Sequence, residues 1–423
     1  MRTRQLFVSG FALFAMFFGA GNLIFPPFLG KAGGEAWVIG FLCFFLVEAL
    51  SCVGIYATIH GGGSVPAMAK SVGIKPGVVL NTAAILCTGV FIAPPRTAAT
   101  TYEMAIRPLF DGIGLLPFSI LFFVVVFLLT IRPSRVVEII GKCLTPVLIA
   151  GIFLLIAVGI AQPIGEIGPA SSPNIAQEGL LAGYQAMDIL SVAGFAIIIQ
   201  DSMVQSGLKT WKEQRPQVAG STGIAALLLA VVYGGLTFLG ATTSTAFGDG
   251  LDQAGLIVAI TQALLGQVGV VILAIVVTLA CLTTAIGLFG ATASYFERMS
   301  RGRLSYRNGI ILLSVISCAI CNLGLSTIIR FASPVLSVIC PPFMTTVVLL
   351  AFQNWISRPG LYKGAALGAT LAALVLTLQQ YLGLFPLAEQ LPFCDYGFGW
   401  LIPAVVGGGI GALLSKPSEL SAD

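Results

Sequence analysis

Two short stretches place groups that can bind ions inside apolar sequence. The first runs from Gly19 to Asn22 and interrupts a hydrophobic segment that begins near Leu6. Glycine and asparagine at mid-membrane depth free backbone amides and carbonyls that lipid cannot satisfy, so this break must line a site buried in protein. The second stretch is Thr283 and Thr284, two adjacent hydroxyls in another apolar segment. Backbone carbonyls and hydroxyls are oxygen ligands, which suit a hard cation.

The break offers one face to an anion and another to a cation. A half-helix that resumes near Leu23 points its N-terminal amides and positive dipole end at the midplane, which suits a carboxylate. The half-helix before the break ends with free carbonyls near Ala15 and Phe18, which suits a cation. The expected amide donors are Ala20, Gly21 and Asn22.

The threonine pair is the expected partner of those carbonyls. Thr283 and Thr284 lie one turn after Ala280, whose own carbonyl can join them. A threonine within a helix also commonly bonds back to the carbonyl four residues earlier, and this alternative has no functional meaning. The break in the first apolar segment favours the cation site.

A transporter built from two inverted repeats needs a second broken helix. The sixth apolar segment holds an acid, a serine and a glycine about halfway across, at Asp188, Ser191 and Gly194. We therefore expect its break between Asp188 and Gly194, opposite the first break. The alternative is that these small residues only let helices pack closely.

The composition indicates what must hold these residues. The 423 residues are 57% hydrophobic and 9% charged, with a mean hydropathy of +0.99. Soluble domains are about a quarter charged, so this chain is predicted to be an all-α integral membrane protein. A spanning helix needs about 20 apolar residues, and about twelve such segments are expected. They lie at 6–29, 36–59, 77–104, 115–131, 136–161, 179–204, 218–240, 267–296, 308–324, 328–352, 361–382 and 396–414.

The basic residues predict the orientation. If both termini are cytoplasmic, all but four of the 21 Lys and Arg residues fall in inward segments. The exceptions are Lys31, Arg96, Arg107 and Arg330. This pattern follows the positive-inside rule. The net charge of +4 therefore reflects topology and does not indicate a nucleic-acid partner.

Ionisable residues inside membrane segments are functional candidates. Glu48, in the second segment, is expected to pair with Arg96 in the third, or else Arg96 gates the outer vestibule. Asp188 has three possible roles, which are to meet an ammonium group, to carry a proton, or to lie exposed in the outer vestibule. We do not expect this chain to be an enzyme. His60 is its only histidine, and no residue is predicted to be catalytic.

The segment from Asp252 to Gly266 has an Asp cap and apolar residues at helical spacing, but it is too short and too polar to span a membrane. It is similar to an extracellular lid. The alternative is an interfacial helix with no gating role.

The stretches Met16 to Pro27 and Ala93 to Ala98, with the threonine pair of the eighth segment, resemble the bacterial branched-chain amino acid:cation symporter family. This family belongs to the amino acid-polyamine-cation superfamily. The break is also similar to that of sodium-coupled neurotransmitter-type symporters. The resemblance implies a five-plus-five inverted repeat with broken helices 1 and 6, which divides the chain into 1–162, 177–354 and 355–423.

The same resemblance assigns roles to residues. Amides of Ala20 and Gly21 would hold a substrate carboxylate, and backbone groups at Leu190 and Ser191 would receive its ammonium. Asn22 stands where some relatives bind a second sodium, which is left open here. One sodium site is implied, with ligands from Ala15, Phe18, Ala280, Thr283 and Thr284.

The function implied is sodium-coupled import of leucine, isoleucine and valine across the bacterial inner membrane. The expected partners are these amino acids, Na⁺ and the lipid bilayer, with no cofactor and no obligate protein partner. One alternative is proton coupling through Asp188, Glu48 or Lys142. Another, from a different class, is a transporter-derived nutrient sensor that binds without moving its ligand.

Overall fold

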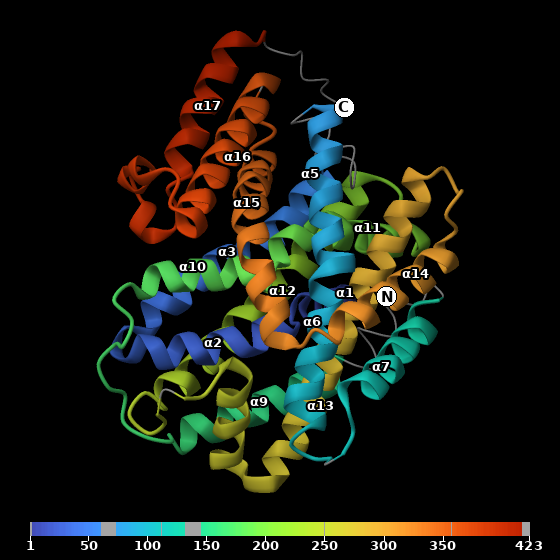
Figure 1. Ribbon diagram of the computed structural model, residues 1–423. Coiled ribbons are helices and arrows are strands. Elements are labelled where there is room, and N and C mark those ends of the chain that lie inside the picture. The colour runs from blue at the N-terminus through green and yellow to red at the C-terminus, as the bar shows by residue number, and fades with distance from the viewer. Residues whose placement is uncertain are drawn as a thin grey trace.

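Apolar sequence of this density folds into helices because a helix satisfies its backbone hydrogen bonds internally. The computed structural model describes residues 2–60, 73–110, 112–131, 145–248, 250–356 and 358–416, and these contain helices but no strand (Figure 1). The first part comprises α1 (Arg2–Phe17), α2 (Ala20–Gly33), α3 (Trp37–His60), α5 (Ile74–Leu86), α6 (Ala93–Thr101), α7 (Leu115–Thr130) and α9 (Thr145–Ala161). The second comprises α10 (Ile175–Ala186), α11 (Asp188–Gln205), α12 (Trp211–Ala241), α13 (Gln253–Met299), α14 (Tyr306–Cys321), α15 (Leu325–Ala351), α16 (Pro359–Leu382) and α17 (Leu401–Leu414).

Short helices connect some of these elements. The segments η1 (Gly34–Ala36), η6 (Pro386–Gln390) and η7 (Cys394–Tyr396) are 3₁₀ turns. Two wider π-turns, η2 (Cys87–Phe91) and η3 (Tyr102–Ile106), flank α6.

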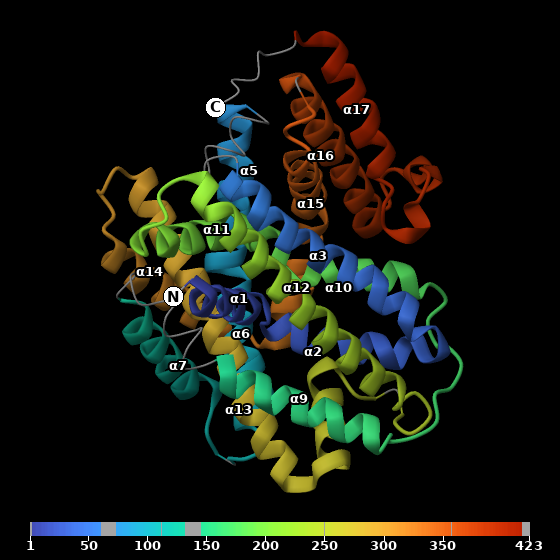
Figure 2. The same ribbon diagram turned by 180° about the vertical axis from the view of Figure 1, so that it is seen from behind.

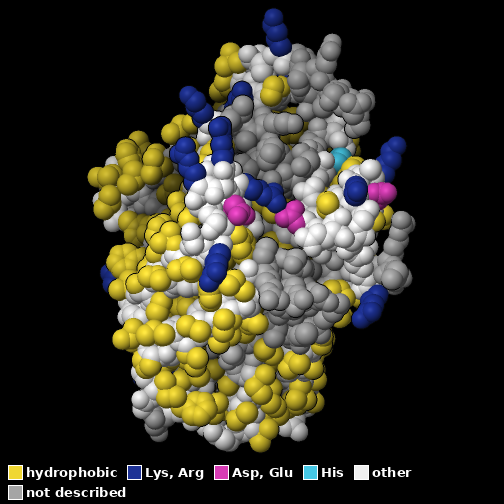
Figure 3. All heavy atoms as spheres, turned by 90° about the vertical axis from the view of Figure 1, so that its right-hand side faces the viewer, with side chains coloured by type: hydrophobic (Ala, Val, Ile, Leu, Met, Phe, Trp, Pro, Cys, Tyr) yellow, Lys and Arg dark blue, Asp and Glu magenta, His cyan; other side chains and the backbone are white. Residues whose placement is uncertain are grey.

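The surface fits a multi-pass membrane protein. Seven helical stretches of the described chain are long and apolar enough to cross a bilayer, and five further apolar helices are shorter. Large apolar side chains point outward, such as Leu121, Val268 and Phe331, which are 62%, 69% and 69% exposed. Figure 3 shows hydrophobic side chains covering the lower part of one face, whereas Lys and Arg gather above them. An apolar belt of this kind is stable only against lipid.

The predicted apolar segments agree with the helices of the structure, and one of these segments can be compared only in part. Each of the twelve apolar segments contains helix where the structure describes it. The fifth segment was expected from residue 136, but residues 132–144, which include Lys142, lie outside the described part.

The helix α13 runs through the centre of the molecule, and α1, α2 and α12 pack near it (Figures 1 and 2). The contact of α2 with α12 is backbone to backbone. A Cβ atom on Gly30 would lie 1.9 Å from the carbonyl oxygen of Thr237, and one on Gly240 would lie 1.9 Å from that of Pro27. Glycine permits this approach because it has no side chain. The backbone of Pro27, which follows the first break, thus forms part of the contact of α2 with α12.

The last two helices form a hairpin that stands beside α15 (Figure 1). Their contact is also built on glycine. A Cβ atom on Gly364 would lie 1.9 Å from the carbonyl oxygen of Gly407, and one on Gly411 would lie 2.0 Å from that of Gly360. Small residues at one-turn spacing let the two backbones touch, which is a common way to pack helices within lipid.

The Gly240→Ala variant tests the contact of α2 with α12. The added methyl meets backbone that cannot move aside, so we expect a loss of about 1–3 kcal/mol of stability, measured as a lower thermal midpoint in detergent. The control is Gly223→Ala on the same helix, where an added Cβ meets nothing within 4 Å. This control should be neutral or slightly stabilising, because alanine favours a helix interior. Equal midpoints for the two variants would contradict the close packing.

Candidate functional site

The first break separates α1 from α2 at Phe18 and Gly19. Gly19 is extended, with φ −109° and ψ −163°, and α2 begins at the next residue, Ala20. The second half-helix was expected to begin near Leu23, so that prediction was wrong by three residues. The reason is that the first amides of a helix have no internal acceptor, which lets Gly21 and Asn22 sit in the first turn at little cost. The amides at this start have no acceptor within the helix, and their role as donors to a carboxylate stays a prediction.

The second break lies at Met187, between α10 and α11. Met187 is left-handed, with φ 68° and ψ 9°, and its amide donates to the carbonyl of Tyr184 at 3.2 Å. The predicted interval from Asp188 to Gly194 was therefore wrong, because Asp188 is the first residue of α11 and the later residues are helical. Gly194 serves packing, since a Cβ atom there would lie 2.9 Å from that of Ala291 on α13.

A small cavity of about 10 Å³ joins the two breaks. Most of the predicted binding residues line it, as do parts of α6 and α13. The predicted residues that line the cavity are Ala20, Gly21, Asn22, Asp188, Ser191, Arg96 and Thr284. Leu190 and Gly194 are outside this wall. This volume holds about one water molecule, so the half-helices are closed around the site in this conformation.

The residues predicted for sodium converge beside this cavity. The Thr283 hydroxyl donates to the carbonyls of Ala15 and Ala280, each at 2.9 Å. The Thr284 hydroxyl donates to the Met16 carbonyl at 3.1 Å and to that of Ala15 at 3.4 Å. Both hydroxyls thus reach across to the end of α1, and neither bonds to the carbonyl four residues earlier.

Phe18, the remaining predicted ligand, lies at the break directly before Gly19. A Cβ atom on Gly19 would be 2.9 Å from the Thr284 hydroxyl oxygen. The break and the threonine pair are therefore in contact, and the carbonyl-rich end of α1 faces two hydroxyls.

A buried polar cluster connects both breaks to α3 and α12. The Asn22 amide Nδ2 donates to Asp188 Oδ2 at 2.7 Å and to Glu48 Oε2 at 3.2 Å, and it also contacts the Tyr233 hydroxyl. These four side chains are between 0% and 6% exposed. Asp188 is therefore not an exposed acid of the outer vestibule. Tyr233 was missed, because a tyrosine in an apolar segment gives no sign of a polar role.

Arg96 does not pair with Glu48, so that prediction was wrong. Its guanidinium donates to the Gln185 carbonyl at 2.6 Å and contacts the Ala186 carbonyl at 3.5 Å. These carbonyls end α10, where a cation is favoured by the helix dipole. A Cβ atom on Gly21 would lie 2.9 Å from Arg96 Nη2. Arg96 thus joins the two half-helices on one side of the breaks.

Arg96 reaches this position because the third apolar segment is itself interrupted. The π-turn η2 ends in a bend at Ile92, and α6 starts at Ala93 with Pro94 and Pro95 in its first turn. Prolines fit there because those amides need no acceptor. The proline pair was a visible signal of this interruption, but the segment was predicted as one continuous helix.

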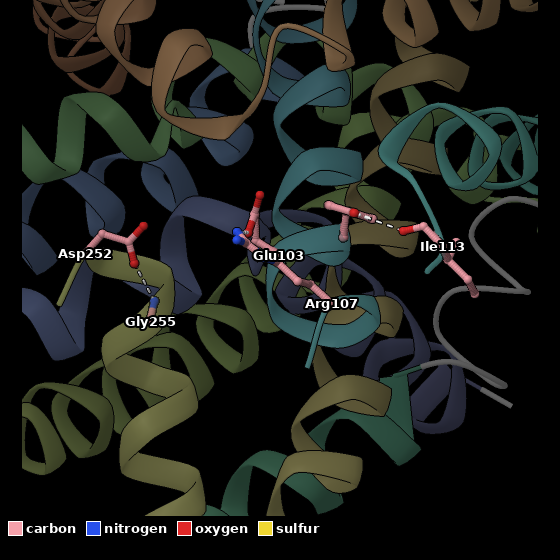
Figure 4. Close-up of polar contacts among 6 residues, drawn as sticks. Glu103, Arg107, Ile113, Asp252 and Gly255 are labelled. Carbon is pink, nitrogen blue, oxygen red and sulfur yellow. Dashed lines mark hydrogen bonds and ion pairs between the residues drawn. The ribbon is translucent and has the colours of Figure 1, made fainter. Parts of the chain in front are cut away.

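The segment predicted as a lid is a helix with its own ends. It starts in α13 after Asp252, whose carboxylate accepts the Gly255 amide at 2.7 Å, and it ends at a kink where Gly266 has φ 57°. Figure 4 shows this start beside η3, where Arg107 bonds Glu103 at 2.8 Å. The lid role itself stays a prediction.

The comparisons with known proteins agree over the whole chain. The family described as branched-chain amino acid transport protein matches residues 2–418. The branched-chain amino acid permease BrnQ of Bacillus subtilis is 34% identical, over 97% of this chain and 96% of the relative. The branched-chain amino acid transport system 2 carrier protein of Pseudomonas aeruginosa is 33% identical, over 98% of each chain.

Solved structures share the fold at low identity. A Na⁺-coupled sialic acid symporter, in a substrate-bound outward-open state, gives a TM-score of 0.66 at 15% identity and covers 98% of this chain. The nucleobase-cation-symport-1 family transporter Mhp1, in a closed conformation, gives 0.68 at 14% identity and covers 97%. Those chains are themselves covered to 91% and 93%. The protein is therefore a transporter rather than an enzyme, and it belongs to the branched-chain amino acid transport protein family.

Proposed function

We propose that this protein is a secondary active symporter that imports leucine, isoleucine and valine together with Na⁺ by alternating access. The observation that carries the proposal is the convergence of the Thr283 and Thr284 hydroxyls on the carbonyl end of α1, next to the first break. The family supports the substrate class. The coupling ion rests on this oxygen cluster and on the likeness to a Na⁺-coupled symporter.

The sodium site would use five oxygens, and the negative dipole end of α1 favours a cation there. The carbonyls of Ala15 and Ala280 already face the hydroxyl of Thr283. When the ion binds, each hydroxyl turns its lone pair toward Na⁺ and releases its donated bond. The proposed ligands are Ala15, Phe18, Ala280, Thr283 and Thr284.

The substrate is a zwitterion, so its site needs donors and an acceptor close together. The free amides at Ala20 and Gly21 suit the carboxylate. Arg96 adds charge beside them, and its buried Nε has no partner among the described residues. The carboxylate of Asp188, with backbone groups at Ser191, suits the ammonium.

The substrate side chain would meet apolar wall. Met16, Phe17, Ala93 and Leu288 line the same cavity. Such a pocket separates side chains that differ by one methylene by only about 1–3 kcal/mol, so one site should accept all three branched amino acids.

The proposed topology has twelve spans, with cytoplasmic termini in a bacterial inner membrane. The grouping of Lys and Arg in Figure 3 supports one positive, inward end. Residues 1–162 and 177–354 would form the inverted repeats, and 355–423 two added helices. Entry of one positive charge is favoured by roughly 2.3 kcal/mol per 100 mV, which Na⁺ would supply.

Uptake of labelled leucine into proteoliposomes tests the coupling ion. We expect an inward Na⁺ gradient to drive accumulation, and Thr283→Ala and Thr284→Ala to raise the Na⁺ concentration for half-maximal uptake about tenfold or more, because each removes an ion ligand. The matched control is Thr278→Ala on α13, whose hydroxyl bonds only back to the Ala274 carbonyl at 2.6 Å. It should keep the wild-type Na⁺ dependence.

Two outcomes would contradict the proposal. Uptake that needs no Na⁺ and survives Thr284→Ala would remove the sodium site. Leucine binding without accumulation under any gradient would indicate a sensor.

Replacing Arg96 tests the substrate site separately. The Arg96→Lys variant keeps the charge but loses the fork that reaches both Gln185 and the cavity, so leucine affinity should fall about tenfold. Na⁺ affinity without leucine should stay within twofold. Arg107→Lys, on an arginine that is 69% exposed, is the control and should bind leucine normally. Scintillation binding to purified protein measures both, and wild-type leucine affinity in Arg96→Lys would rule out this assignment.

A further inference from the structure

Two buried acids meet behind the cavity. Glu48 on α3 and Asp188 on α11 are the two Asp or Glu side chains that are buried in the described part of the chain. Both accept from a single nitrogen, Asn22 Nδ2, at 3.2 and 2.7 Å. The shared nitrogen holds the two carboxyl groups close to each other. Two negative charges at such close range repel, which favours one bound proton.

The described neighbours of the two acids do not supply a second positive charge that could take the place of that proton. The closest cation is Arg96, but it donates to the carbonyls that end α10 and makes no ion pair within 4 Å among the described residues. Tyr233 on α12 and Cys52 on α3 face the pair as neutral groups. Cys281 on α13 lies near Arg96. One positive charge therefore faces two acids, and the repulsion between two like charges this close favours the binding of one proton.

Glu48 is the better place for the proton. Its Oε1 atom is buried and has no hydrogen-bond partner, and a lone oxygen of this kind is costly on an ionised carboxylate. Asp188 lies in the first turn of α11, where the helix dipole favours a negative charge. Asn22 also has only two amide hydrogens for three oxygen neighbours, so it cannot satisfy two full carboxylates and Tyr233 together.

The proton can be exchanged through one route. Glu48, Asn22 and Tyr233 are 0%, 1% and 0% exposed, whereas Asp188 lines the cavity between the breaks. Water that enters this cavity therefore reaches the pair through Asp188. In alternating access the cavity opens to one side of the membrane at a time.

From this geometry we propose that Glu48 and Asp188 form a proton-binding site and that the bound proton is a second coupling ion, carried with Na⁺ and the substrate. On the outer side the ionised pair takes one proton from hydronium and leaves water. On the inner side it returns the proton to water and regains its charge. The inference rests on the proposed transport function and adds one ion to it.

Leucine uptake under a proton gradient tests this site. Proteoliposomes hold equal Na⁺ on both sides, the potential is clamped at zero, and the outside is tenfold higher in proton concentration. With one proton per leucine, wild-type accumulation should rise by up to about tenfold. Glu48→Gln, which mimics the neutral acid, should lose this rise and keep Na⁺-driven uptake. Glu389→Gln, on an exposed outer acid, is the control and should respond as wild type.

The outcomes separate the two proposals. If a Na⁺ gradient drives leucine uptake by the wild type and a proton gradient does not change it, the proton site alone is overturned. A proton response that persists in Glu48→Gln also overturns it. No leucine uptake under either gradient overturns the transport function with it.

Infrared spectroscopy of the wild type gives a test that does not need the variant to fold. The site predicts the carbonyl-stretch band of a protonated carboxylic acid at neutral pH, shifted in D₂O. Exposed acids are ionised at that pH and give no such band. Its absence from the wild-type spectrum overturns the proposal, and its loss in a folded Glu48→Gln variant supports it.

Discussion

The need to satisfy unpaired backbone groups in the middle of a membrane protein governs this structure. Two helices stop halfway, at Gly19 and at Met187, and each leaves amides or carbonyls without an internal partner. Lipid offers no hydrogen bond, so protein side chains or transported groups must supply them. Arg96, Thr283 and Thr284 near the cavity can be understood as responses to this requirement.

The responses differ at the two breaks. The carbonyl end of α10 is held by the charged side chain of Arg96. The carbonyl end of α1 meets only the neutral hydroxyls of Thr283 and Thr284, which can turn away and leave the oxygens to an ion. The amides that start α2 have no acceptor within the helix, which suits the proposed binding of the substrate carboxylate. The carbonyl ends of the two helices thus have different partners, one fixed and one that can be exchanged for an ion. Glycine contacts, such as that of Gly30 with Thr237, let the surrounding helices approach closely.

The sequence predicted the structure best where its composition and backbone geometry are compatible with only one local structure. Long apolar segments predicted the helices, and Gly19 to Asn22 predicted the first break. The start of α2 was misplaced because glycine and asparagine fit equally well before a helix or in its first turn. Met187 could not be predicted, since a left-handed methionine is uncommon and leaves no sequence sign. Glu48 was paired wrongly because spacing along the chain does not tell which face of α3 meets α2 or α6.

The two proposed ligands, Na⁺ and the amino acid, meet at one interruption, so their binding must be linked. Linkage is reciprocal at equilibrium: the factor by which Na⁺ raises the affinity for leucine equals the factor by which leucine raises the affinity for Na⁺. Equilibrium binding to the purified protein, with labelled leucine at rising Na⁺ and labelled Na⁺ at rising leucine, measures both factors. The account predicts two equal factors well above one, and a leucine affinity that does not change with Na⁺ would contradict it.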